Sequence, residues 1–150
     1  MIFTDSIDFT RFLDAQNQLY LRALSEIKSG RKQSHWMWFI FPQLKGLGHS
    51  ETASFYALKR IEDAELYLAH PVLGKHLIEI SQALLEWTSD DAHAIFSSPD
   101  DLKLRSSMTL FANTRNADAV FDKVIDKYFN GLHDERTLQL LIKDKLHDTV

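Results

Sequence analysis

The chain has 150 residues, of which 45% are hydrophobic, and a formal net charge of −4. This length suits one domain with a sizeable core, so residues 1–150 are expected to form a single domain. The absence of cysteine excludes disulfides and thiolate metal sites. The mild acidity argues against sequence-independent nucleic-acid binding, and no nucleic-acid partner is expected. No apolar run has the length of a membrane span or a signal-peptide core, which predicts a soluble, cytoplasmic protein without membrane contact.

The first two thirds of the chain carry mostly helical signals. Apolar residues at three- and four-residue steps predict a helix over about 8–29, ended by Gly30. The aromatic run at 36–41 has the composition of either a strand or a buried helical turn. Further helices are expected over about 50–58, 61–69, 71–87 and 90–95, with Ser50 as the cap of the first of these and Pro71 opening the third. Gly74 lies inside a helix, where it costs about 1 kcal/mol relative to alanine, and so indicates close approach of a neighbouring backbone.

The last third shows the same kind of pattern. The run Ser-Pro-Asp-Asp at 98–101 predicts a helix start with a capping serine, and that helix should reach about residue 111. Apolar residues over 120–129 predict the next helix, which Gly131 ends, and Asp134 should cap the last one. The chain is therefore predicted to be mainly α, a single compact domain of about seven helices with at most a minor extended element near residues 36–41.

The run from His35 to Gln43 is the first candidate for a functional segment. It holds two of the three tryptophans. His35 is either a hydrogen-bonded residue at the edge of the core or a general acid or base beside an aromatic wall. Trp36 and Trp38 are most simply core residues, and replacing Trp38 by alanine is expected to cost about 3–5 kcal/mol. One of the two is also a candidate wall for stacking a planar ligand, because a tryptophan N–H needs a partner.

The loop that follows, Lys45-Gly46-Leu47-Gly48-His49-Ser50, is the second candidate. Gly46 and Gly48 would let the backbone approach a ligand closely. The next helix start offers free N–H groups to a phosphate or carboxylate, and Lys45 and His49 could add to this. A plain connecting loop remains the alternative, since a lone Gly-x-Gly matches no phosphate-binding fingerprint.

The third candidate lies inside the helix expected after residue 98. Lys103, Ser106 and Ser107 would share a face at three- and four-residue steps. Serines have no particular propensity for the middle of a helix, so they either permit close helix packing or face a polar pocket with the lysine. A Ser–Lys nucleophile pair would need a third group, and none is indicated, so no covalent catalysis is expected.

The seven histidines do not have the spacing of a helical metal site. No two of them lie three or four residues apart, and the nearest pair, His70 and His76, straddles a proline. We therefore expect no metal and no cofactor.

Four segments together resemble one uncharacterised bacterial family. They are His-Trp-x-Trp-Phe-x-Phe-Pro-Gln (35–43), Gly-Leu-Gly-x-Ser (46–50), Tyr-Leu-x-His-Pro-Val-Leu-Gly (67–74) and Pro-Asp-Asp-Leu-Lys-Leu-Arg-Ser-Ser-Met-Thr-Leu-Phe (99–111). The family is the domain of unknown function 1810, sometimes labelled calpastatin. The resemblance covers nearly the whole chain and implies no established activity or catalytic residue. A calpastatin-like inhibitor would be expected to be polar and disordered, unlike this hydrophobic, patterned chain.

The sequence is compatible with two functions. In the first, the three candidate segments line a pocket that binds or hydrolyses a small anionic ligand, such as a phosphate- or nucleotide-like metabolite. In the second, the chain is a non-catalytic protein-interaction domain whose unusual residues build the core. The two differ in where the segments lie, because the first requires residues 46–50 and 103–107 to face one cleft near His35.

Overall fold

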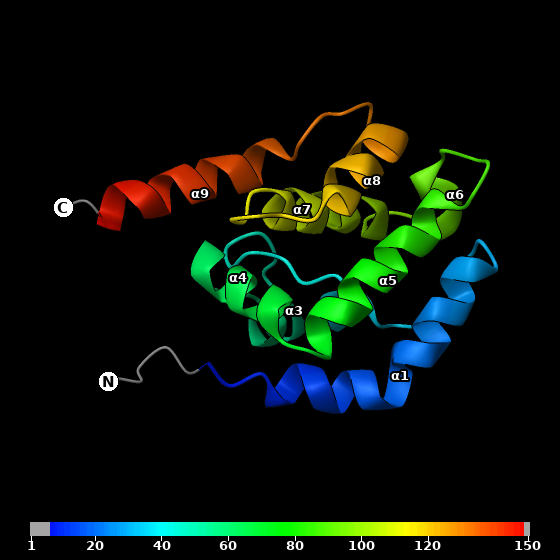
Figure 1. Ribbon diagram of the computed structural model, residues 1–150, viewed down its shortest axis with the longest axis horizontal. Coiled ribbons are helices and arrows are strands. Elements are labelled where there is room, and N and C mark those ends of the chain that lie inside the picture. Colours follow the sequence, from blue (N-terminus) through cyan, green and yellow to red (C-terminus); the bar gives the residue numbers. More distant parts are fainter. Residues whose placement is uncertain (1–6, 149–150) are drawn as a thin grey trace.

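The computed structural model describes residues 7–148, and that part of the chain consists of nine helices without a strand (Figure 1). The helices are α1 (Thr10–Lys28), α2 (Met37–Ile40), α3 (Glu51–Tyr56), α4 (Ile61–Ala69), α5 (Leu73–Leu85), α6 (Ala92–Phe96), α7 (Asp100–Ala112), α8 (Ala119–Phe129) and α9 (Glu135–Asp148). This confirms a mainly α fold. The described chain has more helices than the seven or so expected, and the ambiguous run at 36–41 contains the helical turn α2 rather than a strand.

Helix α5 lies at the centre of the molecule (Figure 1) and contacts α1, α4 and α8. Its apolar residues recur at the predicted spacing, and Leu73, Leu77, Ile80 and Leu84 are all buried. Helix α8 packs on α7, and α7 in turn contacts α6 and α9. The hydrophobic core therefore runs from α1 through α5 to α7 and α8, while α9 lies over one end of α7.

Some of the helix starts have a capping side chain, and two others differ from the start expected from the sequence. Ser50, Asp91 and Asp118 cap α3, α6 and α8 with their side chains. Ser98 was expected to cap α7, but its hydroxyl donates to the Asp101 carboxylate instead, and α7 begins at Asp100. Helix α5 starts at Leu73 rather than at Pro71. The N–H groups of Val72 and Leu73 at this start donate to the His70 ring.

Gly74 has the packing role that its position in a helix indicated. A Cβ atom at this residue would lie 2.0 Å from the carbonyl oxygen of Leu68. No side chain fits at that distance, so glycine is what lets the start of α5 pass against the end of α4.

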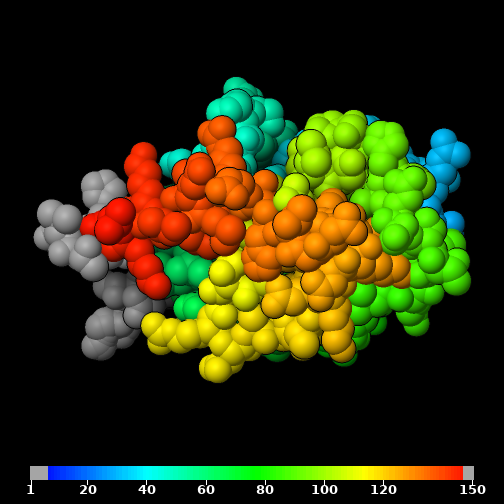
Figure 2. Space-filling view, turned by 90° about the horizontal axis from the view of Figure 1, so that it is seen from above, coloured from blue at the N-terminus to red at the C-terminus, as the bar shows by residue number. Residues whose placement is uncertain are grey.

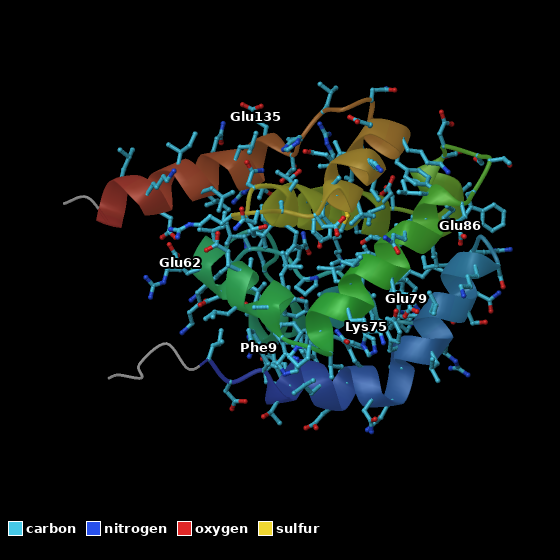
Figure 3. The ribbon with its side chains drawn as sticks, in the orientation of Figure 1. Phe9, Glu62, Lys75, Glu79, Glu86 and Glu135 are labelled. Carbon is cyan, nitrogen blue, oxygen red and sulfur yellow. The ribbon has the colours of Figure 1, made fainter. Side chains whose placement is uncertain are left out.

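A polar network that the sequence analysis did not identify crosses the core. The amide nitrogen of buried Gln16 donates to the Phe39 carbonyl at 2.7 Å and contacts the Tyr67 hydroxyl at 2.9 Å, and its oxygen lies 2.8 Å from His76 Nδ1. His76 stacks on Tyr20, whose hydroxyl donates to Glu79, a residue of α5 labelled in Figure 3 above α1. Burial lowers the pKa of His76, so the neutral ring is favoured. Through Phe39 the network fixes the turn α2 that carries Trp38.

Candidate functional site

The two tryptophans of the aromatic run have different environments. Trp36 is fully buried, and its indole N–H donates to Glu26 at 2.8 Å. Trp38 is partly exposed and lines a cleft. In a helical turn successive side chains point about 100° apart, so when Met37 and Phe39 enter the core, Trp38 is turned outward. Trp36 is thus the core residue and Trp38 the wall of a hollow, which corrects the expectation that Trp38 is a deeply buried residue.

Glu26 holds the loop before α2 against α1. Its carboxylate accepts hydrogen bonds from the Ser34 hydroxyl at 2.6 Å, the Gln33 N–H at 2.8 Å and the Trp36 indole. Burial alone would raise the pKa of Glu26, but these hydrogen bonds outweigh it and lower the pKa to about 2. The ionised carboxylate therefore fixes the start of the aromatic run.

The cleft beside Trp38 has a volume of about 640 Å³ and is built from three parts of the chain that lie far apart in sequence. They are the segment 38–53, the start of α7 and the start of α9. Figure 2 shows the three together on one face, with the loop before α3 in cyan, the start of α7 in yellow-green and the start of α9 in orange. The lining residues are Trp38, Gln43, Leu47, Gly48, His49, Ser50, Ala53, Pro99, Leu102, Lys103, Ser106, Asp134 and Arg136.

Lys103 is the central cation of the cleft. Its Nζ lies 4.9 Å from the centroid of the Trp38 ring, a distance at which the cation is attracted by the ring. It also lies 3.3 Å from an oxygen of Asp100, whose other oxygen pairs with Lys32 at 2.9 Å. One carboxylate is thus shared by two lysines, and the neighbourhood of Trp38 keeps an excess of positive charge.

Asp134 lies across the cleft at the start of α9. Its Oδ2 accepts hydrogen bonds from the Ser106 hydroxyl at 3.1 Å and from the Thr137 N–H at 3.0 Å and hydroxyl at 2.5 Å. The described residues offer its Oδ1 no hydrogen bond. Asp134 therefore caps α9 as predicted and joins this helix to α7 through Ser106.

The glycine loop forms the rim of the cleft and of a smaller recess of about 140 Å³ beside it. Gly48, His49 and Ser50 line the cleft, whereas Lys45 and Gly46 line the recess. Gly46 has a φ of +104°, a conformation that other residues rarely adopt. The Ser50 hydroxyl accepts the Ala53 N–H at 3.0 Å, so it serves the helix as a cap.

Besides Lys45 and Gly46, which line only the recess, three of the predicted site residues line neither the cleft nor the recess. His35 is exposed and lines neither the cleft nor the recess. Trp36 belongs to the core. Ser107 is fully buried, and the described residues offer its Oγ no hydrogen-bond partner. The prediction that Ser107 shares a face with Lys103 and Ser106 is therefore wrong. Lys103 and Ser106 line the cleft, and Ser107 points about 100° away from Ser106 around the helix axis.

Arg136 and Asp134 are lining residues that the sequence analysis did not assign to the site. The Arg136 guanidinium donates to the Gly46 carbonyl at 3.1 Å, which fixes the glycine loop against α9. From the sequence, Asp134 is recognisable only as a helix cap, and an arginine in the first turn of a helix has no pattern that indicates a site. The missing information is that the last helix returns to a loop 90 residues earlier.

The arrangement is suited to holding an anion next to a planar group. Lys103 and Arg136 supply positive charge, Trp38 supplies a flat apolar surface, and Gln43 supplies an amide. Among the residues that the structure describes, no group of three or more His, Asp and Glu side chains could hold a metal ion. Nor is any described helix long and apolar enough to cross a membrane.

Comparisons with known proteins place the chain in a family without assigned activity. A family model described as a protein of unknown function (DUF1810) matches residues 6–141. The crystal structure of the conserved hypothetical protein Rv1873 from Mycobacterium tuberculosis is similar, with 44% identity and a TM-score of 0.87 over 89% of this chain and 95% of that one. The comparison with curated proteins found no match. The chain therefore belongs to the DUF1810 family of proteins of unknown function.

Proposed function

We propose that the cleft binds a small metabolite that carries an anionic group and a planar group, as a nucleotide does. The observation that carries the proposal is the position of Lys103, whose ammonium lies over the Trp38 ring at one wall of the cleft. An anion drawn to this lysine comes within reach of the aromatic ring, so the two parts of one ligand are held together.

The rest of the lining supports the same ligand. The volume of about 640 Å³ falls within the range of small-molecule sites. Arg136 lines the same cleft and offers a second cation, and Gly48 is exposed at the rim. The carboxylate of Asp134 and the imidazole of His49 are the groups that could transfer a proton, so a hydrolytic reaction of the bound ligand would depend on them.

Isothermal titration calorimetry with adenosine monophosphate, adenosine and inorganic phosphate tests the proposal. The monophosphate should bind more tightly than either fragment, because only it uses both the cation and the ring. Lys103→Ala should reduce its affinity about tenfold, the loss of one charge-assisted contact of about 1.4 kcal/mol. Lys123→Ala, which removes an exposed lysine of α8 that lines no part of the cleft, is the control.

Three outcomes decide the matter. If phosphate and adenosine monophosphate bind with equal affinity, the ligand needs no planar group. No binding of any of the three would reject it. Chromatography of adenosine monophosphate incubated with the protein shows whether the bound ligand is hydrolysed. If the hydrolysis product is not formed by the Asp134→Asn variant, the reaction takes place in the cleft.

A non-catalytic interaction domain is the second candidate, and exposed apolar residues on and before α9 favour it. Ile142 is 60% exposed and Leu132 62% exposed. Ile142 also lines a shallow apolar hollow of about 350 Å³ with Leu138 and Leu141. If the cleft binds none of the three ligands, this surface becomes the place to search for a protein partner.

A further inference from the structure

Two further hollows lie along α3, the first of them next to the cleft. The cleft and the small recess share Trp38, Gln43 and Gly48 in their walls. The recess and a third hollow, of about 440 Å³, share Ser54 and Ala57. The two hollows therefore border the same part of α3 and its C-terminal end. We call the three hollows together the α3 groove.

The backbone aligns two lysines along the middle of this groove. Leu44 and Leu58 form an isolated parallel bridge, in which the Lys45 N–H donates to the Leu58 carbonyl at 2.7 Å and the Leu58 N–H donates to the Gln43 carbonyl at 3.0 Å. Both leucines are buried. The exposed Lys45 and Lys59 each follow one of these leucines, so the bridge holds the backbones of the two lysines close together.

The third hollow is a second cationic site. Arg11, Lys59 and Arg60 line it, together with Asp8 and Asp63. The Arg11 guanidinium is held in place by the carbonyls of Phe55 and Asp8, each at 2.8 Å. The Phe55 side chain is 58% exposed and lines the same hollow, so an aromatic ring accompanies the cations here as Trp38 does in the cleft.

The charge along the groove is opposite to that of the whole chain. Its walls contain six lysines and arginines against three aspartates, on a protein with a formal net charge of −4. Of these cations only Lys103 has a carboxylate within 4.0 Å among the described residues. A groove with an excess of positive charge attracts anions. The cations are Lys103 and Arg136 in the cleft, Lys45 in the recess, and Arg11, Lys59 and Arg60 in the third hollow.

We infer that the ligand is elongated and carries two separated phosphate groups, the chemistry of a 5′-phosphorylated dinucleotide. This rests on the proposed function, in which the cleft holds one phosphate and one base at Lys103 and Trp38. The dinucleotide would then extend past Lys45 and place its second phosphate at Lys59 and Arg60. Cations that follow a backbone and aromatic rings on which bases stack are the combination that holds short single-stranded nucleotides. An acidic peptide would use the cations and leave both exposed rings without a planar partner.

Calorimetry with the full chain and three probes tests the inference. The probes are adenosine monophosphate, 5′-phosphorylated diadenylate and tripolyphosphate. The dinucleotide should bind about tenfold more tightly than the monophosphate, the gain from one further charge-assisted contact. The double variant Lys59→Ala/Arg60→Ala should abolish this gain and leave the affinity for the monophosphate unchanged. Both side chains are exposed and belong to no ion pair of the described structure, so the variant is expected to fold.

Each result has a defined consequence. If the dinucleotide binds no more tightly than the monophosphate, or if the double variant weakens both equally, the second phosphate site is rejected while the cleft proposal stands. If tripolyphosphate binds as tightly as the dinucleotide, the bases take no part and the dinucleotide class is overturned. If the monophosphate fails to bind, the proposed function fails and this inference fails with it. Lys123→Ala should leave all three affinities unchanged.

Discussion

At the scale of single residues, the two tryptophans at positions 36 and 38 have different roles. Trp36 is sealed in the core with its N–H bonded to Glu26, and Trp38 faces the cleft with a lysine over its ring. The sequence showed that one of the pair could be a ligand wall but not which one. That choice depends on α2 being a helical turn, which rotates Trp38 outward, and on the Glu26 carboxylate, which anchors Trp36 from another helix.

The two tryptophans should therefore differ in their contribution to stability. Trp36→Ala empties a fully buried position and is expected to lower the free energy of unfolding by about 3–5 kcal/mol. Trp38→Ala removes a partly exposed ring and should cost about 1 kcal/mol. Urea unfolding of both variants measures the difference, and equal losses would contradict the assignment of Trp36 to the core and Trp38 to the cleft.

Glu26 should make the fold sensitive to acid. Its pKa of about 2 in the folded chain lies below the ordinary value of 4.5. Because folding lowers the pKa, the ionised group adds stability that is fully present above pH 4.5 and is lost as the pH falls toward 2. Glu26→Gln should destabilise the protein at pH 6 and flatten this part of its curve of unfolding free energy against pH. Parallel curves for the two proteins between pH 4.5 and 2 would show that Glu26 is not the group responsible.

At the scale of elements, the crossing of α4 and α5 depends on one glycine. Gly74→Ala would gain about 1 kcal/mol in helix propensity anywhere else. Here the added carbon would meet the Leu68 carbonyl oxygen, and the backbones must move apart at a net cost of about 1–3 kcal/mol. Thermal unfolding of this variant beside Lys75→Ala, an exposed neighbour on the same helix, gives the comparison. A Gly74→Ala protein as stable as the control would contradict the close crossing.

Local signals predicted most of the helices but not how they meet. Apolar spacing gave α1, α5 and α8, and Asp134 and Ser50 gave two helix starts, because these depend on residues three or four positions apart. The polar network of Gln16 and His76 was not predictable, since its side chains come from α1, α4 and α5 and have no local pattern. The site was predicted only in part. Lys103 and the glycine loop could be recognised from their unusual local composition, whereas Arg136 lines the cleft only because α9 packs beside that loop.

At the scale of the whole molecule, the cleft exists because three chain segments converge at the end of the helical core. Neither the aromatic run nor the glycine loop forms a hollow by itself, and α9 closes the third side through Arg136 and Asp134. The cationic groove along α3 then runs across a molecule that is acidic as a whole. Because α9 forms one side of the cleft, ligand binding there should be lost when α9 is displaced.

The indole N–H resonances of the three tryptophans, followed by NMR while adenosine monophosphate is added, test the central claim most directly. Trp36 and Trp87 serve as internal controls, because their N–H groups are bonded to Glu26 and to the Ile27 carbonyl, each at 2.8 Å. The Trp38 signal should shift and saturate, while the other two stay in place. A Trp38 signal that does not move, or equal shifts of all three, would contradict a ligand site in this cleft.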